Sequence, residues 1–76
     1  MKRLGTAVRT AQGVLVVQSP DETTPELGTE VVDESLGTVG TVVDVFGPVE
    51  RPYLAISPDA DVRLAMLVGS PVYTRP

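Results

Sequence analysis

The stretch VGTVVDVFGPVERPY, residues 39–53, predicts a strand, a rigid turn and the start of a second strand. Its first half is rich in valine and threonine, which favour extended backbone. Gly47-Pro48 ends the first strand, because proline fixes its own φ and lacks the N–H that a β-ladder uses. Pro52 fixes the entry to a second strand over residues 53–57. Strict alternation predicts two faces, one with Val39, Thr41, Val43 and Val45 and the other with Gly40, Val42, Asp44 and Phe46.

The flanking sequence predicts further short strands separated by glycine and proline turns. The expected strands cover residues 4–10, 14–18, 29–32 and 72–75. In the first of them, alternation puts Leu4, Thr6 and Val8 on one face. The unbroken apolar run at 14–17 suggests burial on both faces, or a partner.

The connections contain the usual turn residues. Gln12-Gly13 is a turn, and residues 19–28 and 57–61 are expected loops. The turn at 33–37 should place Leu36 against the body of the fold, and residues 64–68 could form at most one turn of helix. About six or seven short strands without a convincing helix indicate an all-β fold, a small closed β-barrel, since closure removes exposed strand edges.

Composition narrows the possible functions. The chain has 76 residues, so we expect a single domain over residues 1–76, and it contains neither cysteine nor histidine. Disulfides, thiolate and imidazole metal ligands and the commonest general base are therefore excluded, and we expect no zinc site and no cofactor. No apolar run approaches the roughly 20 residues of a membrane span. We expect a soluble, cytoplasmic protein with no membrane partner.

The charge is acidic, with 10 acidic residues against 6 basic ones and a net charge of −4. All the acidic residues lie between Asp21 and Asp61, and most basic residues lie towards the two ends. An acidic surface is a poor binder of phosphate, because affinity for nucleic acid comes largely from cations that displace counterions. One hypothesis is adaptation to a high-salt cytoplasm; the alternative is an ordinary small acidic protein.

Few residues could carry chemistry. Asp44 lies among valines and could have a raised pKa there, although an outward or arginine-paired carboxylate is the simpler interpretation. Asp59 and Asp61 have the spacing of a calcium loop without the further ligands it needs. The Gly37–Gly40 segment is half of a nucleotide fingerprint but leads into a strand, not a helix. No set of nucleophile, base and oxyanion hole is present, so the sequence does not indicate an enzyme or a small-molecule substrate.

An apolar group at the central turn is the remaining candidate site. Five residues crowd there: Phe46, Pro48, Val49, Pro52 and Tyr53. One interpretation is that the two aromatic rings plug the barrel. The other is a docking surface for a protein, because a turn with two prolines cannot fold all five side chains inward.

Three segments resemble a known family: KRLGTAV (2–8), VGTVVDVFGPVERPYLAI (39–56) and VGSPVY (68–73). They are similar to the archaeal form of Gar-one, the small subunit of H/ACA ribonucleoproteins. The resemblance implies a six-stranded barrel of the translation-factor (reductase/elongation-factor) type. It also implies a non-catalytic subunit in RNA-guided pseudouridylation of rRNA, and hence in ribosome biogenesis, within the cytoplasm of an archaeal cell.

The resemblance implies a protein partner. Members of the family dock on the TruB-like pseudouridine synthase, help to position its thumb loop, and promote substrate loading and product release. Guide RNA is met only indirectly, through the complex. The matching interface positions are Val45, Phe46, Gly47, Pro48, Val49, Pro52 and Tyr53. Two alternatives stay open: a PRC-barrel module of the ribosome-maturation type, which shares the V-G-x-V-x-D-V strand, and a small enzyme using Asp44.

Overall fold

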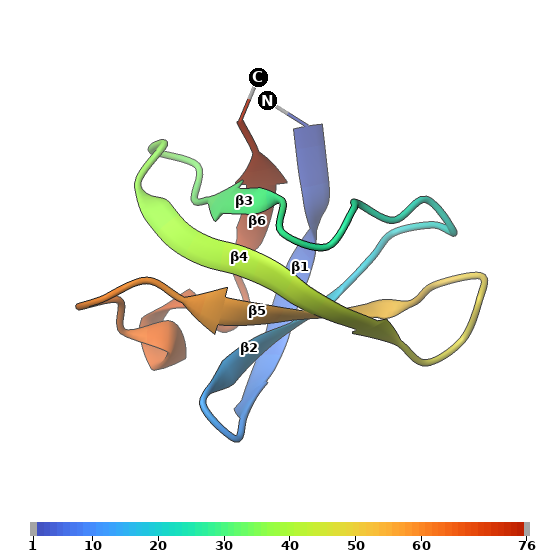
Figure 1. Ribbon diagram of the computed structural model, residues 1–76, viewed down its shortest axis with the longest axis horizontal. Coiled ribbons are helices and arrows are strands. Elements are labelled where there is room, and N and C mark those ends of the chain that lie inside the picture. Colours follow the sequence, from blue (N-terminus) through green and yellow to red (C-terminus); the bar gives the residue numbers. More distant parts are fainter. Residues whose placement is uncertain (1, 76) are drawn as a thin grey trace.

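The computed structural model describes residues 2–75 as six antiparallel strands that close into a barrel (Figure 1). The order around the barrel is β1-β2-β5-β4-β3-β6. A short 3-10 helix, η1 (Leu64–Leu67), precedes the last strand. The strands are β1 (Lys2–Ala11), β2 (Val14–Gln18), β3 (Glu30–Val32), β4 (Thr38–Phe46), β5 (Tyr53–Pro58) and β6 (Pro71–Thr74). The predicted fold class, an all-β closed six-stranded barrel, is therefore confirmed.

The β1–β2 hairpin follows directly from its sequence. Ala11 pairs with Val14 across a two-residue loop. Gln12 and Gly13 in that loop both have positive φ, 51° and 82°. This is the pattern of a type I′ turn, whose twist matches that of the flanking strands.

The core is built from branched aliphatic side chains on neighbouring strands. Leu15 pairs with Ile56 and Val17 with Leu54, and all four are fully buried. Val16, between the two inward residues of β2, is also buried, so the prediction that this run is covered on both faces is confirmed. The remaining members of the core cluster are Leu4, Ala7, Val31, Val39, Val42 and Val72.

Strict alternation is the wrong prediction for β4. Its inward residues are spaced by three: Val39 and Val42 belong to the core, and Val45 packs against it, whereas Val43 is 48% exposed. The register with β3 skips Val39, and the register with β5 shifts between Val42 and Asp44. Each irregularity inserts one residue and reverses the alternation beyond it.

Strand β1 deviates from alternation for the same reason. Its pairing skips Leu4 opposite β6 and Val8 opposite β2. Leu4 and Ala7 therefore enter the core, and Val8, predicted to share the face of Leu4, is 38% exposed. The bulges let a ten-residue strand pair with both β2 and β6 while it bends around the barrel.

Two connections also differ from prediction. Leu36 does not pack on the barrel: it is 47% exposed and has a φ of 65° at the tip of its turn. The turn is held by Asp33, whose Oδ1 accepts hydrogen bonds from the backbone N–H groups of Ser35 and Gly37, each at 2.9 Å. Strand β5 extends to Pro58, into the segment predicted as a loop. Between residues 2 and 75 there is no helix with the length and apolar character needed to span a membrane.

Candidate protein-docking surface

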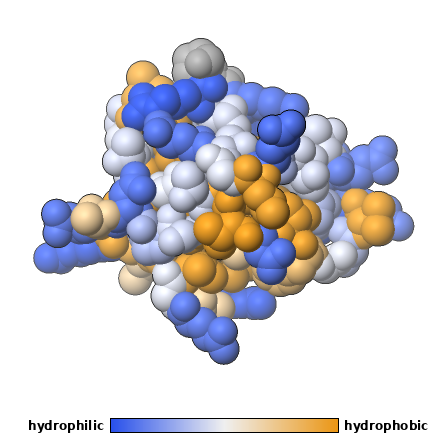
Figure 2. Space-filling view, viewed as in Figure 1, coloured by the Kyte–Doolittle hydropathy of each residue, from blue (hydrophilic) through white to orange (hydrophobic). Residues whose placement is uncertain are grey.

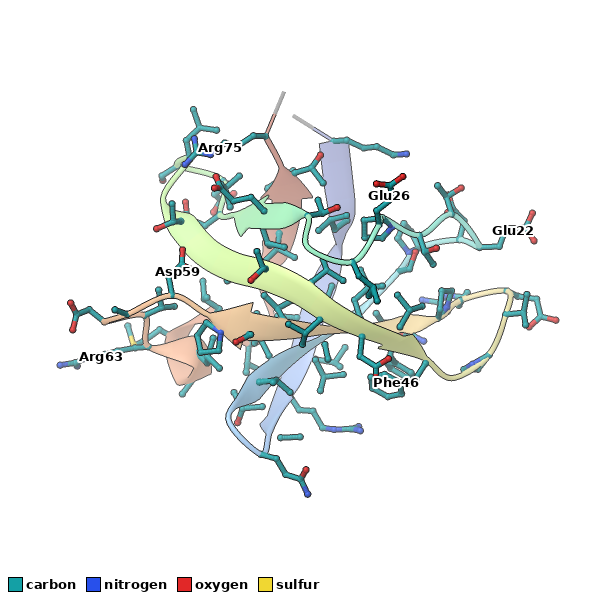
Figure 3. The ribbon with its side chains drawn as sticks, viewed as in Figure 1. Glu22, Glu26, Phe46, Asp59, Arg63 and Arg75 are labelled. Atoms are coloured by element: carbon teal, nitrogen blue, oxygen red, sulfur yellow. The ribbon has the colours of Figure 1, made fainter. Side chains whose placement is uncertain are left out.

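The β4–β5 hairpin places the two predicted aromatic residues side by side. Phe46 ends β4, Tyr53 begins β5, and the two residues are cross-strand partners. Their rings stack with centroids 5.6 Å apart and an interplanar angle of 24°. Neither ring belongs to the core cluster: Phe46 is 39% exposed and Tyr53 is half-buried. Both rings therefore lie at the surface instead of plugging the barrel, and Phe46 points outward beside the hairpin loop (Figure 3).

Gly47 makes this aromatic stack possible. Its φ is 86°, a left-handed conformation that costs other residues roughly 1–2 kcal/mol. A Cβ at this position would lie 2.7 Å from Cδ2 of Tyr53, closer than atoms can pack. Position 47 therefore requires glycine for two reasons: the left-handed backbone conformation and the close approach of the Tyr53 ring.

The other predicted interface residues differ in exposure. Pro48 is exposed and Val49 is 77% exposed at the tip of the loop, whereas Val45 packs against the core. Pro52 is buried, and its carbonyl accepts a hydrogen bond from the backbone N–H of Ser19 at 2.9 Å. Pro52 thus anchors the hairpin loop to the segment after β2, and its side chain is not available to a partner.

Sequence reasoning missed two exposed residues, Leu27 and Val43. Val43 is the bulged residue of β4, and Leu27 is 64% exposed. The segment after Leu27 lies along β4, because Gly28 N–H donates to the carbonyl of Val42 at 2.8 Å. Figure 2 shows hydrophobic residues gathered over this part of β4. Leu27 did carry a signal, as the one large apolar residue in an otherwise polar, proline-containing loop. We define the hydrophobic surface as Leu27, Val43, Phe46, Pro48, Val49 and Tyr53.

The acidic candidates do not form a chemical site. Asp44 points outward, and its Oδ1 accepts a hydrogen bond from the backbone N–H of Val45 at 2.8 Å. Val45 lies past the part of β4 that pairs with β3, so the Asp44 carboxylate provides a partner for this N–H group. Asp59 and Asp61 are both exposed. No group of three or more carboxylates within residues 2–75 is placed to hold a metal ion.

Comparison with protein families identifies the family of this chain. The family described as the Gar1/Naf1 RNA binding region matches residues 1–76, the whole chain. The chain belongs to the Gar1/Naf1 family. The resemblance to Gar-one is thereby confirmed, and membership implies a role in the H/ACA ribonucleoprotein as a non-catalytic, RNA-binding type of subunit. A search of curated proteins gives no match.

This Gar1/Naf1 chain has a net charge of −4. Glu22 and Glu26 project from the loop that precedes β3 (Figure 3). Within residues 2–75 the one ion pair joins Arg75 to Glu30. The other carboxylates therefore contribute unpaired negative charge to the surface, which opposes the approach of an RNA backbone.

Proposed function

We propose that this chain is the Gar1-like subunit that docks on the TruB-like pseudouridine synthase of the H/ACA ribonucleoprotein. In that complex it helps to position the thumb loop, and it promotes substrate loading and product release during RNA-guided pseudouridylation of rRNA. It contributes no catalytic group. Guide RNA meets it through the complex and not through a high-affinity site of its own.

The single observation that carries the docking proposal is the Phe46–Tyr53 stack beside a glycine–proline turn. The two rings are fixed by their contact with each other and with Gly47. A partner therefore gains a large apolar contact without ordering flexible side chains. Aromatic residues at such positions commonly dominate the energy of an interface.

The test is the affinity for purified synthase, measured by calorimetry or biolayer interferometry. Phe46→Ala and Tyr53→Ala should each weaken binding by about thirty-fold, since truncating a central aromatic residue typically costs about 2 kcal/mol. Met66→Ala is the matched control, because Met66 is 77% exposed in η1, which lies at the end of β5 opposite the β4–β5 loop (Figure 1). Asp59→Ala should also bind normally.

Each variant must first show the circular dichroism spectrum and thermal unfolding of a folded barrel. If both aromatic variants fold and bind with unchanged affinity, the docking surface lies elsewhere on the barrel. If Met66→Ala lost as much synthase affinity as the aromatic variants, exposed apolar side chains in general, and not this surface, would determine the affinity.

A further inference from the structure

A second feature lies beside the aromatic stack, a groove of about 230 Å³ at the junction of β1, β2 and the hairpin loop. Two arginine side chains line it, Arg3 from β1 and Arg51 from the loop between β4 and β5. The remaining lining residues carry no charge; they are Gly5, Thr6, Val8, Gln18 and Pro20. The charged side chains that line this groove are therefore all cationic, although the chain as a whole has a net charge of −4.

Both guanidinium groups are available for a ligand. Arg3 and Arg51 are exposed, and neither makes a salt bridge with a carboxylate of residues 2–75. Arg3 is oriented by its own strand, because its Nη2 donates a hydrogen bond to Oγ1 of Thr6 at 2.7 Å. Its remaining N–H groups keep their hydrogen-bonding capacity, since a guanidinium carries five donors.

The groove is continuous with the hydrophobic surface. Thr6 pairs with Gln18, Gln18 with Tyr53, and Tyr53 with Phe46. Side chains of directly paired residues lie on the same face of a sheet. These four residues therefore form one row across the outside of the barrel, with the groove at one end and the aromatic stack at the other. A protein seated on the stack would reach the groove.

We propose that the Arg3–Arg51 groove binds a carboxylate side chain of the same protein partner that covers Phe46 and Tyr53. The proposal rests on the proposed function, since it requires a protein docked on the hydrophobic surface. An arginine fork matches the two oxygens of an aspartate or glutamate and can bind them in a bidentate geometry.

A carboxylate fits this groove better than an RNA backbone does. Two cations can neutralise one or two anionic groups, but a polyanion would also meet the acidic surface around them. Glu50 adjoins Arg51 in the chain, and Asp21 adjoins Pro20 of the groove. The repulsion grows with each further phosphate, whereas one carboxylate on a protein partner feels mainly the two arginines.

The experiment measures synthase affinity for the double variant Arg3→Gln/Arg51→Gln over a range of salt concentrations. We expect a loss of roughly ten-fold or more at low salt, which shrinks as salt screens the wild-type contact. Arg63→Gln is the matched control. Arg63 is exposed, precedes η1, does not line the groove and lies on the side of the barrel opposite the β4–β5 loop that carries Arg51 (Figure 3), so the affinity of this variant should stay at the wild-type value.

Phe46→Ala, measured in parallel, separates this proposal from the proposed function. If Phe46→Ala weakens binding and the arginine variant does not, the carboxylate site is wrong and docking stands. If neither weakens binding, both are wrong. If the arginine variant keeps its synthase affinity but loses binding of the free protein to guide RNA, the groove is a phosphate site and the proposal is overturned.

Discussion

Tyr53 covers Gly47 so closely that residue 47 has no room for a side chain. Gly47→Ala should therefore lower the free energy of unfolding by more than the roughly 1–2 kcal/mol expected for a left-handed backbone alone. It should also separate the stacked rings, which near-ultraviolet circular dichroism detects. Gly13→Ala is the control, because Gly13 has a φ of 82° but an added Cβ there would meet no atom within 4 Å. If urea titrations gave the two variants equal losses in the free energy of unfolding, the Tyr53 ring would move aside without an energetic cost.

At the level of the strand, the bulge in β4 determines which of two adjacent valines is buried in the core. Val42 is 1% exposed and Val43 is 48% exposed, although they are adjacent. Val42→Ala should cost about 2 kcal/mol of stability, from lost burial and the cavity that remains. Val43→Ala should cost less than about 0.5 kcal/mol. Chemical denaturation of the two variants checks this assignment. A larger loss of stability in Val43→Ala than in Val42→Ala would contradict the bulge and support a strictly alternating strand.

The same strand shows what the sequence can and cannot predict. Gly47-Pro48 and Pro52 define the hairpin through local backbone chemistry, so the aromatic residues were predicted to meet at a turn. The inward face of β4 was predicted wrongly, because a bulge depends on how many residues the partner strand offers and not on the bulged strand alone.

Tertiary contacts explain the other omissions in the candidate site. Leu27 reaches β4 only because hydrogen bonds between residues 28–29 and Val42 fix its loop there. Pro52 is buried where its carbonyl accepts the backbone N–H of Ser19, a contact between residues far apart in the sequence. Turn chemistry within a few residues is readable from the sequence, whereas contacts across the barrel depend on its closure.

At the level of the whole molecule, the charge predicts weak binding of RNA by the free chain. Ten acidic residues against 6 basic ones leave little cationic surface to displace counterions. Gel-shift titrations with guide or substrate RNA at moderate salt should show no high-affinity complex. Tight binding with a steep dependence on salt would contradict this expectation and would show that the basic residues act together.

The same charge predicts that salt stabilises the fold. Most of the acidic side chains are exposed and, within residues 2–75, only Glu30 has a cationic partner in a salt bridge. Screening should relieve their mutual repulsion, so the melting temperature should rise between dilute and molar sodium chloride. Thermal melts followed by circular dichroism measure this shift, and an unchanged melting temperature would remove repulsion as a destabilising factor.

Closure of the barrel by β1 and β6 also brings the start of β1 next to the end of β6. Lys2, the first residue of β1, pairs with Thr74, the last residue of β6, so these two strand ends lie side by side (Figure 1). A short linker could therefore join them, and the chain could be reopened in the tight Gln12-Gly13 loop without removing any strand pairing. Such a circular permutant would keep the hydrophobic surface and the arginine groove intact. The connection order of the strands and the surface that they present are thus separable properties of this barrel.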